Sequence, residues 1–441
     1  MLEFIAIPLI LLLILTVQNK LRKTEAKTFL AIVLGDVGHS PRTLSHCTAA
    51  NLSGITGYLV GYDISPIHSE AKKHINIINI PAYPKFLQCV LPKYPNFLLK
   101  AVYNSLCLAF TILFKCYMTK YSKIILQNPP SIPTLAILGI LKFICNYEFI
   151  IDWHNYGYTI MKANKQNSTF VKLCESYEFL FARLADFHFT VTESMKKDLS
   201  RRAGIDSSKI TVLYDKPSPQ FRSTNHQTNR IISQILPNFA EENLPIIISS
   251  TSWTKDEDFS LFFDALEEYE NIAQVQNLPK IGVIITGKGP EKDYYMKKIF
   301  DDRGETGWNH IRWNFPWLKA DDYPKILNAA SIGVCLHASS SGLDLPMKVV
   351  DMLGSGLPVL ALNYQSIEEL VIPNINGELF NNTEELLYLL VKYLSNIKKT
   401  GNNNYPREQF ENALAAFRSV DNSWESEWRN RVIREAKLFD L

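Results

Sequence analysis

The 441-residue chain is too long for one small hydrophobic core, so its length predicts two or three domains. Hydrophobic residues make up 46% of it and charged residues 20%, an ordinary globular composition that excludes a largely disordered protein. The formal net charge of +2 is too small to attract polyanions strongly, so nucleic acid is not an expected partner. Seven scattered cysteines without a C-x-x-C pair indicate reduced thiols in a cytosol-facing protein rather than disulfides or a zinc site.

The N-terminus carries an almost unbroken apolar run at residues 4–17, followed directly by basic residues between 20 and 27. The run is shorter than the roughly 20 residues of a comfortable membrane span, so a cleaved signal peptide is the alternative. A signal peptide carries its positive charge before the apolar run, whereas only Glu3 precedes this one. The pattern therefore favours an uncleaved anchor at residues 1–24, with the body of the protein in the cytosol.

Short β-branched runs alternate with helix-length segments along the chain, which is the rhythm of a parallel sheet covered by helices on both faces. It predicts an α/β protein with two doubly wound sheets in tandem, in domains at 25–215 and 245–441, joined by a polar linker at 216–244. The last helices, at about 407–437, are candidates to cross back to the first domain. The expected strands are 28–34, 57–60, 75–80, 123–127, 148–152, 188–191 and 210–214, then 245–250, 280–286, 310–313, 332–336 and 358–362. The expected helices include 170–184, 256–269, 291–299, 321–330 and 347–353.

Two further apolar stretches, at 102–118 and 132–151, allow two interpretations. One is a buried crossover helix and strand. The other is a face of the first domain that lies on the membrane and meets a lipid-linked substrate. Periodicity does not separate them.

Ligands bind open α/β sheets at the carboxyl ends of the strands, so the loops there are candidate sites. The first strand runs into Gly35-Asp36-Val37-Gly38, and the helix that follows carries Arg42. Gly35 and Gly38 permit close backbone approach to a ligand, the helix N–H groups favour an anion, and Arg42 can bind phosphate in bidentate fashion. A purely structural turn is the alternative.

A second candidate loop, Asp152-Trp153-His154-Asn155-Tyr156, crowds polar and aromatic groups at the end of an apolar strand. Asp152 and His154 could supply a general base and its partner, and Trp153 and Tyr156 could stack on sugar rings. The alternative is that His154 and Asn155 only cap the next segment.

The second half offers a strand-to-helix turn at Gly287-Lys288-Gly289 and a richer loop at 337–351. Small residues in that loop, among them Ser340, Ser341 and Gly342, precede Asp344 and a helix, so they could cradle a diphosphate. On the helix, Lys348 suits a phosphate and Asp351 suits paired ribose hydroxyls. A surface ion pair between Lys348 and Asp351 is the alternative.

These segments resemble one family of enzymes. Pro346-x-Lys348-x-x-Asp351-x-x-Gly354-x-Gly356-x-Pro358-Val359 is similar to the donor-site signature of GT-B glycosyltransferases, with Asp where Glu is common. Further runs, collinear over nearly the whole chain, resemble the chitobiosyldiphosphodolichol β-mannosyltransferases. These runs are GDVGHSPR (35–42), QNPPSIPT (127–134), IDWHNYGY (151–158), YDKP (214–217), SSTSWTKDEDFS (249–260), ITGKGP (285–290) and HASSSGLDLPMKVVDM (337–352).

The resemblance implies a GT-B fold, with two Rossmann-like doubly wound domains, a cleft between them and an N-terminal membrane anchor helix. It implies an inverting hexosyltransferase that adds the first β1,4-mannose from GDP-mannose to GlcNAc2-diphosphate-dolichol in N-glycan precursor assembly. The enzyme would sit in the endoplasmic reticulum membrane with its catalytic domains facing the cytosol, and other dolichol-pathway mannosyltransferases are suggested partners. A sugar-nucleotide epimerase would not need the anchor, and a non-catalytic scaffold would not need the loops above.

Inversion requires one in-line displacement, with a base at the acceptor hydroxyl and stabilisation of the departing diphosphate. Asp152, His154 and Asp36 are the base candidates. Many GT-B enzymes have a phosphate-binding Lys where this chain has Asp256-Glu257-Asp258, so that role is expected to move to Lys348 and backbone amides. No residues show metal-ligand spacing and no cofactor is obligatory, although Mg²⁺ could assist loosely. The expected acceptor-binding residues are Gly35, Gly38, Arg42, Trp153 and Tyr156, and the donor-binding residues are Gly287, Lys288, Gly289, Ser340, Ser341, Gly342, Asp344, Lys348 and Asp351.

Overall fold

A computed structural model of the chain describes residues 25–439, apart from 68–71, 85–91, 119–120, 223–238, 240–241, 255–256, 302–303, 305–306 and 320. The expected anchor at 1–24 and most of the expected linker lie outside the described residues. Within the described part of the chain, no helix has both the length and the apolar character that crossing a bilayer requires.

The chain folds into two units. The first runs to Tyr214 and is completed by the C-terminal segment from Trp424, and the second comprises Asp215–Ser423. The expected assignment of all of 245–441 to one domain is therefore wrong beyond Ser423. Of the segment expected to cross back, 407–437, the part from Trp424 onward does so and completes the first unit's core with apolar side chains, whereas 407–423 belongs to the second unit.

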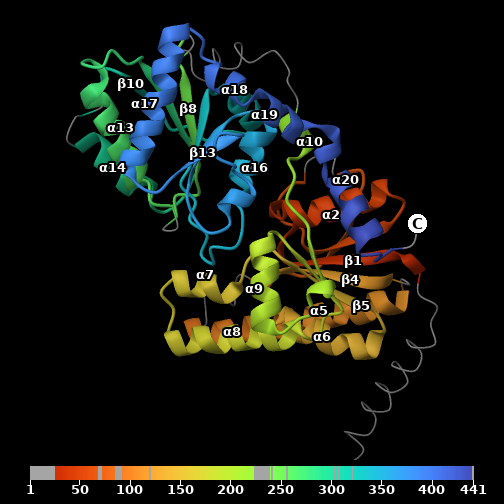
Figure 1. Cartoon of the computed structure of the whole chain (residues 1–441). Helices are drawn as coiled ribbons and strands as arrows, with labels where there is room; N and C mark the ends of the chain where they lie inside the picture. Colours follow the sequence, from red (N-terminus) through yellow and green to blue (C-terminus); the bar gives the residue numbers. More distant parts are fainter. Residues whose placement is uncertain are drawn as a thin grey trace, which may run out of the picture. The chain divides into compact units, whose positions relative to one another are not determined.

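The first unit contains a seven-stranded sheet with the order β3-β2-β1-β4-β5-β6-β7. Figure 1 shows β1, β4 and β5 side by side in this sheet. All neighbours pair in parallel. The central strands are nearly continuous apolar runs, as expected for strands covered on both faces. The strands are β1 (Glu25–Asp36), β2 (Thr56–Tyr62), β3 (Asn76–Asn79), β4 (Tyr121–Asn128), β5 (Glu148–Trp153), β6 (Phe187–Thr190) and β7 (Ile210–Val212).

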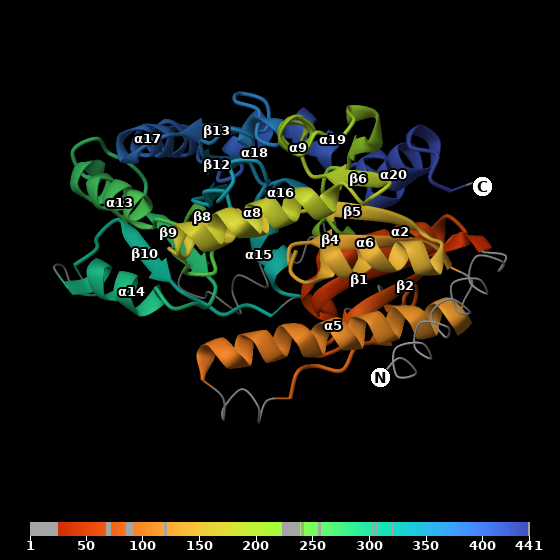
Figure 2. The ribbon, with the colours of Figure 1, turned by 90° about the horizontal axis from the view of Figure 1, so that it is seen from below.

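Helices cover both faces of this sheet: α2 and α20 lie on one face and α5, α6 and α8 on the other (Figures 1 and 2). Local sequence sets their ends, as α9 shows: the Thr192 hydroxyl accepts from the N–H of Met195, and Gly204 at φ 66° ends the helix. The helices are α2 (Pro41–Leu52), α5 (Lys93–Met118), α6 (Thr134–Cys145), α7 (Gly157–Ala163), α8 (Ser168–Ala182), α9 (Glu193–Ala203) and α20 (Trp424–Trp428), with 3-10 turns at Val37–His39 and Ser207–Lys209 and a π-helix at Arg429–Glu435.

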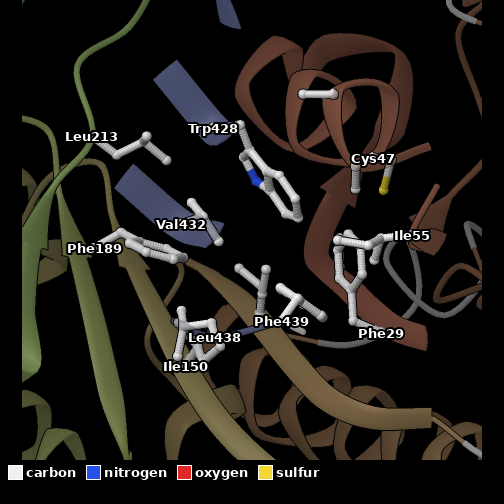
Figure 3. Close-up of a cluster of buried hydrophobic side chains, with 14 of the residues drawn as sticks. Phe29, Cys47, Ile55, Ile150, Phe189, Leu213, Trp428, Val432, Leu438 and Phe439 are labelled. Carbon is white, nitrogen blue, oxygen red and sulfur yellow. The ribbon is translucent and has the colours of Figure 1, made fainter. Parts of the chain in front are cut away.

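The core of the first unit joins the first strand to the C-terminal segment (Figure 3). The ring of Phe29 in β1 lies 6.3 Å from that of Trp428 and 5.6 Å from that of Phe439, and the last two rings lie 5.5 Å apart. Val432 and Leu438 are buried in the same cluster. The first strand and the C-terminal segment are therefore joined by a large apolar contact. Burial of apolar surface of this kind gives folded proteins most of their stability.

The second unit contains a six-stranded parallel sheet with the order β10-β9-β8-β11-β12-β13. The strands predicted from the sequence are present in both units with shifted ends, but β13 was missed. The strands are β8 (Ile246–Ser250), β9 (Ile281–Thr286), β10 (Ile311–Asn314), β11 (Ile332–Cys335), β12 (Val359–Leu362) and β13 (Gly377–Phe380). The helices are α10 (Pro219–Arg222), α13 (Ser260–Ala273), α14 (Lys292–Asp301), α15 (Tyr323–Ala329), α16 (Met347–Gly354), α17 (Thr383–Thr400), α18 (Tyr405–Gln409) and α19 (Glu411–Arg418), with 3-10 turns at Ile367–Glu369 and Val420–Asn422.

Each sheet reverses its strand order once, between β1 and β4 in the first unit and between β8 and β11 in the second. Ligands of doubly wound sheets bind at such switch points, outside the carboxyl ends of the strands. The loops that follow these four strands and their neighbours are therefore the candidate ligand-binding loops.

Candidate functional site

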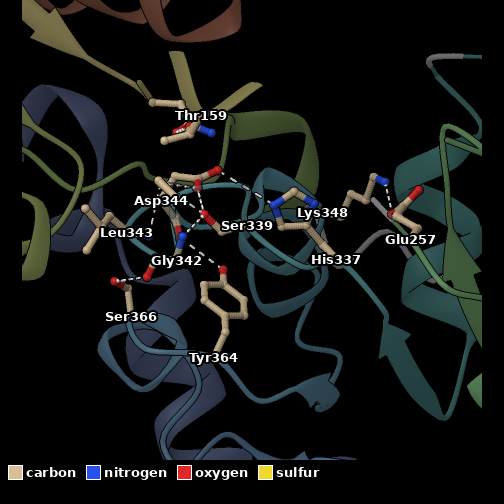
Figure 4. A network of polar contacts seen from close by, with 12 residues as sticks. Thr159, Glu257, His337, Ser339, Gly342, Leu343, Asp344, Lys348, Tyr364 and Ser366 are labelled. Atoms are coloured by element: carbon tan, nitrogen blue, oxygen red, sulfur yellow. Dashed lines mark hydrogen bonds and ion pairs between the residues drawn. The ribbon is translucent and has the colours of Figure 1, made fainter. Parts of the chain in front are cut away.

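A buried carboxylate organises the loop after β8 in the second unit. Glu257 is 2% exposed and accepts hydrogen bonds from the Thr251 hydroxyl (2.6 Å) and the Ser252 N–H (3.0 Å). Its other oxygen forms an ion pair with the ammonium of Lys348, on the helix that follows β11 (Figure 4). Lys348 is thus held at the switch point by Glu257, and the alternative of a surface pair with Asp351 does not describe its contact.

The serine-rich loop after β11 is closed by its own hydrogen bonds (Figure 4). The Ser339 hydroxyl donates to Asp344 and accepts from the Gly342 N–H at 2.9 Å. The Ser341 hydroxyl accepts from the Leu343 N–H at 3.2 Å. The N–H groups of Gly342 and Leu343 and the buried carboxylate of Asp344 therefore hold the loop in shape, and donor binding by Ser341, Gly342 and Asp344 stays a prediction.

Two more contacts fasten this loop from the segment after β12. The Tyr364 hydroxyl donates to the carbonyl of Asp344 at 3.0 Å, and the Ser366 hydroxyl donates to the carbonyl of Gly342 at 2.8 Å. Ser340 is exposed at the tip of the loop.

The glycines of the turn after β9 are required by the chain itself. A Cβ on Gly287 would lie 1.7 Å from the carbonyl oxygen of Thr251, and one on Gly289 would lie 1.7 Å from that of Ser252. Close backbone approach occurs here, but it is between the loops after β9 and β8. Lys288 is exposed, with its ammonium 4.3 Å from the ring centroid of Trp317. That lysine remains available to an anionic ligand.

Asp351 lies on the same helix as Lys348 but in a different environment. Burial, together with the nearby carboxylate of Asp215, raises its pKa well above the ordinary range of an aspartate. A desolvated carboxylate gains when hydroxyl groups donate to it. The expected role of Asp351 toward the ribose hydroxyls stays a prediction.

The glycines that follow in the donor signature serve packing. A Cβ on Gly354 would lie 2.3 Å from the Cβ of Pro217, and Gly356 has a φ of 67° beside the guanidinium of Arg418. The run YDKP and the donor signature are therefore linked by contact within the second unit, without either glycine needing to touch a ligand.

In the first unit the structure corrects two expected roles. Arg42 and Asp152 form a bidentate ion pair, with Nε and Nη2 each 2.7 Å from a carboxylate oxygen, and both side chains are at most 2% exposed. His46 Nε2 lies 3.0 Å from the same carboxylate. Burial alone would raise the pKa of Asp152, but Arg42 and then His46 outweigh it and hold that pKa well below the usual range. Asp152 is therefore not available as a general base, nor Arg42 as a phosphate ligand.

The expected sugar-stacking aromatics are core residues. Trp153 and Tyr156 are both 0% exposed and pack edge to face with ring centroids 5.5 Å apart. Trp153 donates from Nε1 to His188 Nδ1 at 3.1 Å. The expectation that these two rings bind the acceptor sugars is wrong, because neither presents a face to solvent.

Asp36 lies at the carboxyl end of β1, where its side chain is 15% exposed. Burial raises the pKa of Asp36. Hydrogen bonds from Ser65 and from the Gly38 N–H lower that pKa by more than burial raises it, so the net shift is downward. The exposed His39 lies 3.2 Å from the other carboxylate oxygen. Gly38 is required by the fold, since a Cβ there would lie 2.5 Å from the carbonyl oxygen of Ser65, whereas Gly35 has only ordinary contacts. Asp36 remains a candidate base.

His154 follows β5 and is anchored through its backbone, whose N–H donates to the carbonyl of Asn128 at 2.8 Å. The side chain is partly exposed, and its Nδ1 is buried without a hydrogen-bond partner in the described structure. Unpaired buried nitrogens are uncommon in native proteins and call for an explanation. A substrate group that completes the hydrogen bonding of this ring would provide one.

Sequence reasoning missed the residue that positions the His154 loop. Glu178 of α8 is 1% exposed and accepts from Gly157 N (2.9 Å), Tyr158 N (3.1 Å) and Asn128 Nδ2 (3.2 Å), and also from the Ser131 hydroxyl. One carboxylate thus ties the loops after β4 and β5 together. Its signal in the sequence was its helical spacing from the buried positions 171 and 174, which places it on the inner face.

No group of three or more His, Cys, Asp or Glu side chains that could hold a metal ion occurs among the residues whose placement is described.

The amino-acid sequence is similar to a known family of enzymes and to several named proteins. The family of glycosyl transferases group 1 matches residues 246–396, the unit that carries Glu257 and Lys348. A chitobiosyldiphosphodolichol β-mannosyltransferase from Kluyveromyces lactis is 36% identical, over 99% of this chain and 95% of that protein. The proteins of the same name from Homo sapiens (34%, over 93% of both chains) and Candida albicans (38%, over 87% of this chain and 83% of that one) are similarly related.

Solved structures of low sequence identity share the fold. A glycosyltransferase from Rickettsia africae matches with a TM-score of 0.65 and 16% identity, over 95% of this chain and 99% of that one. A sucrose-phosphate synthase from Thermosynechococcus elongatus matches with a TM-score of 0.67 and 12% identity, over 93% and 98%. With its two parallel α/β sheets, the chain has the GT-B-like glycosyltransferase fold.

Proposed function

The chain belongs to the chitobiosyldiphosphodolichol β-mannosyltransferase family, and we propose that it transfers mannose from GDP-mannose to GlcNAc2-diphosphate-dolichol. The acceptor hydroxyl attacks C1 of the mannose, the bond from C1 to the diphosphate oxygen breaks, and GDP leaves. The single displacement inverts the anomeric centre and gives a β1,4 linkage. The observation that carries this proposal is the identity to enzymes of that name over nearly the whole chain.

The donor side of the proposal rests on two residues of α16. Lys348 would neutralise the charge that grows on the diphosphate as the glycosidic bond breaks, which is where a cation contributes most to the rate. Glu257 holds its ammonium in place at the switch point beforehand. Asp351 would accept hydrogen bonds from the ribose hydroxyls, which offset the cost of its burial.

The base is proposed to be His154, with Asp36 as the alternative. With Asp152 paired to Arg42, these two are the remaining candidates, and both lie at carboxyl ends of strands in the first unit. Histidine is the side chain that acts most often as a general base in enzymes, which favours His154 over Asp36. The Nδ1 atom of His154 also lacks a partner that a substrate could supply.

The site of action is proposed to be the endoplasmic reticulum membrane, with both units in the cytosol. The apolar run at 4–17 and the basic residues that follow it support this orientation. A lipid-linked acceptor also requires the enzyme to work at a membrane surface. Mg²⁺ is proposed at most as a stimulant, and other dolichol-pathway mannosyltransferases remain proposed partners.

The proposal is tested by incubating the purified full-length chain in detergent with GDP-mannose and a chitobiose-diphosphate lipid. Mass spectrometry should show a lipid heavier by one hexose, and GDP should be released in equal amount. UDP-glucose and UDP-N-acetylglucosamine serve as control donors and should give no product. Transfer from a UDP-sugar in place of GDP-mannose would contradict the proposed donor.

A further inference from the structure

The helix α5 is apolar on two opposite faces. Its inner face buries Leu108 and Ile112 against the sheet, both at 0% exposure. Val102, Leu106 and Phe110 repeat with the same four-residue spacing but offset by two positions, which places them on the opposite side of the helix. They are 47%, 66% and 71% exposed. A helix that only bridged two strands would need the inner face alone.

The exposed apolar surface continues onto two neighbouring helices. α6 packs against both α5 and α8, and the three lie together on one face of the sheet (Figures 1 and 2). Phe143 of α6 is 63% exposed and Leu173 of α8 is 64% exposed. Scattered exposed apolar residues are ordinary on a soluble protein, but a layer of three adjacent helices that each expose large ones is not.

The charged residues of α5 are all basic, whereas Lys142 of α6 is paired with Asp186 at 2.5 Å and α8 contains Glu175 and Glu178. α5 contains Lys93, Lys100 and Lys115 and α6 contains Lys142, and neither helix has an aspartate or glutamate. An apolar helix face whose charged residues are all basic, as on α5, fits the interface of an anionic bilayer.

The described part of the chain begins near one end of α5. β1 begins at Glu25, which pairs in register with Tyr121 at the start of β4. β4 follows α5 after two residues, so the described chain begins, at Glu25, near the C-terminal end of α5. A membrane segment at that point would bring the outer side of α5 close to the lipid surface.

We propose that the outer face of α5, α6 and α8, defined by Val102, Leu106, Phe110, Phe143 and Leu173, is a docking surface for an anionic bilayer. The large apolar side chains enter the interfacial region of the lipid, and the exposed Lys100 of α5 stays at the level of the headgroups. The surface holds the first unit flat on the membrane that carries the acceptor. This deepens the proposed function and rests on it for the lipid-linked acceptor, but the contact with lipid is measurable without any transfer reaction.

A photoreactive benzoylphenylalanine placed at Phe110 or Leu173 of the full-length chain tests the contact directly. A matched control position is Tyr388 of α17, which is 68% exposed and lies in the other unit. In vesicles of phosphatidylcholine with phosphatidylinositol, irradiation should give phospholipid adducts at 110 and 173 but not at 388. Absence of lipid adducts at 110 and 173, equal adducts at all three positions, or adducts to a second protein chain would overturn the proposal.

A second measurement keeps the docking surface separate from the chemistry. Leu106→Ser with Phe110→Ser should lower transfer to an acceptor embedded in vesicles by about tenfold or more, because two large side chains no longer enter lipid. Transfer in detergent should stay within about twofold of the parent, as should both activities of Tyr388→Ser. Equal loss in vesicles and detergent would contradict the docking role. Failure of the parent in detergent would instead contradict the proposed function, and the adduct pattern would still decide the docking surface.

Discussion

Arg42 and Asp152 form a buried bidentate ion pair that links α2 to the end of β5. A third guanidinium nitrogen, Nη1, donates to the carbonyl of Leu213 at 3.0 Å, and the guanidinium lies 5.2 Å from the ring centroid of Trp424. His46, which also contacts Asp152, accepts from Trp428 Nε1 at 3.2 Å. The pair therefore connects the central sheet to the C-terminal segment that crosses back, and its role is to hold the first unit together.

Asp152→Asn should reduce folding stability rather than act only on catalysis. Removing one partner of a buried ion pair leaves the other charge uncompensated and commonly costs about 3–5 kcal/mol. Because the folded-state pKa of Asp152 is depressed, its contribution is present above the ordinary aspartate pKa and is lost as the pH falls below it. Denaturant unfolding of parent and variant from acid to neutral pH should show the difference narrowing on the acid side. A stability difference between parent and variant that is absent, or that does not change with pH, would contradict the structural role of the pair between Arg42 and Asp152.

His154→Ala should lower kcat by about 10²–10⁴-fold with little change in the affinity for GDP, because the base acts only in the reacting complex. Asp36→Asn is the matched comparison. If the base is His154, Asp36→Asn retains most of the turnover. A large loss in Asp36→Asn with near-parental turnover of His154→Ala would move the base to Asp36.

Lys348→Ala should raise the KM for GDP-mannose and lower kcat, since charge on the diphosphate grows in the transition state. It also leaves Glu257 buried without its cation, which should cost roughly 1–3 kcal/mol of stability. The double variant Lys348→Met with Glu257→Gln separates these effects. It should regain stability, as measured by thermal unfolding, but not activity. Recovery of activity along with stability would show that Lys348 has only a structural role.

Asp351→Asn should bind GDP about ten- to a hundredfold more weakly, because charge-assisted hydrogen bonds to the ribose are lost. The same variant should be more stable than the parent near neutral pH. The raised pKa of Asp351 means that the folded state binds more protons than the unfolded state above the ordinary aspartate pKa, so parental stability falls as pH rises through that range. Calorimetric titration with GDP and unfolding at several pH values measure both effects. Parental GDP affinity in the variant would remove Asp351 from the donor site.

Trp428→Ala tests the packing contact between the first strand and the C-terminal segment. Loss of a fully buried tryptophan typically costs about 3–5 kcal/mol, and the first unit should lose stability accordingly. The control is Trp317→Ala, at a side chain that is 62% exposed, where a change within about 0.5 kcal/mol is expected. Chemical denaturation of both variants measures the difference. Equal costs at the two positions would contradict the description of the C-terminal segment as part of the first unit's core.

The β-α-β rhythm of the sequence was sufficient to predict the strands of the two sheets, because parallel strands buried on both faces are nearly continuous apolar runs. β13 was not predicted, because Gly377–Phe380 is a four-residue edge strand that contains a glutamate and has no continuous apolar run. The return of the C-terminal segment could be suggested but not bounded, because the contact of Trp428 with Phe29 joins residues from opposite ends of the chain.

The candidate site was predicted by segment more successfully than by residue. Sequence order alone cannot show that Asp152 faces Arg42 on another element, so an acid beside an imidazole looked like a catalytic pair. Likewise, Trp153 and Tyr156 follow a strand end in the sequence but turn into the core. Glu178 and Glu257 were overlooked because their importance comes from burial and from partners that only the fold brings near.

The central claim is that this chain makes a β-mannosyl linkage on a lipid-linked chitobiose. The most direct test is to let the purified full-length protein act on GDP-mannose and a chitobiose-diphosphate lipid, then treat the isolated trisaccharide with linkage-specific mannosidases. The account predicts one added mannose that a β-mannosidase removes and an α-mannosidase does not. A product that only an α-mannosidase cleaves, or no trisaccharide from protein shown to be folded, would contradict it.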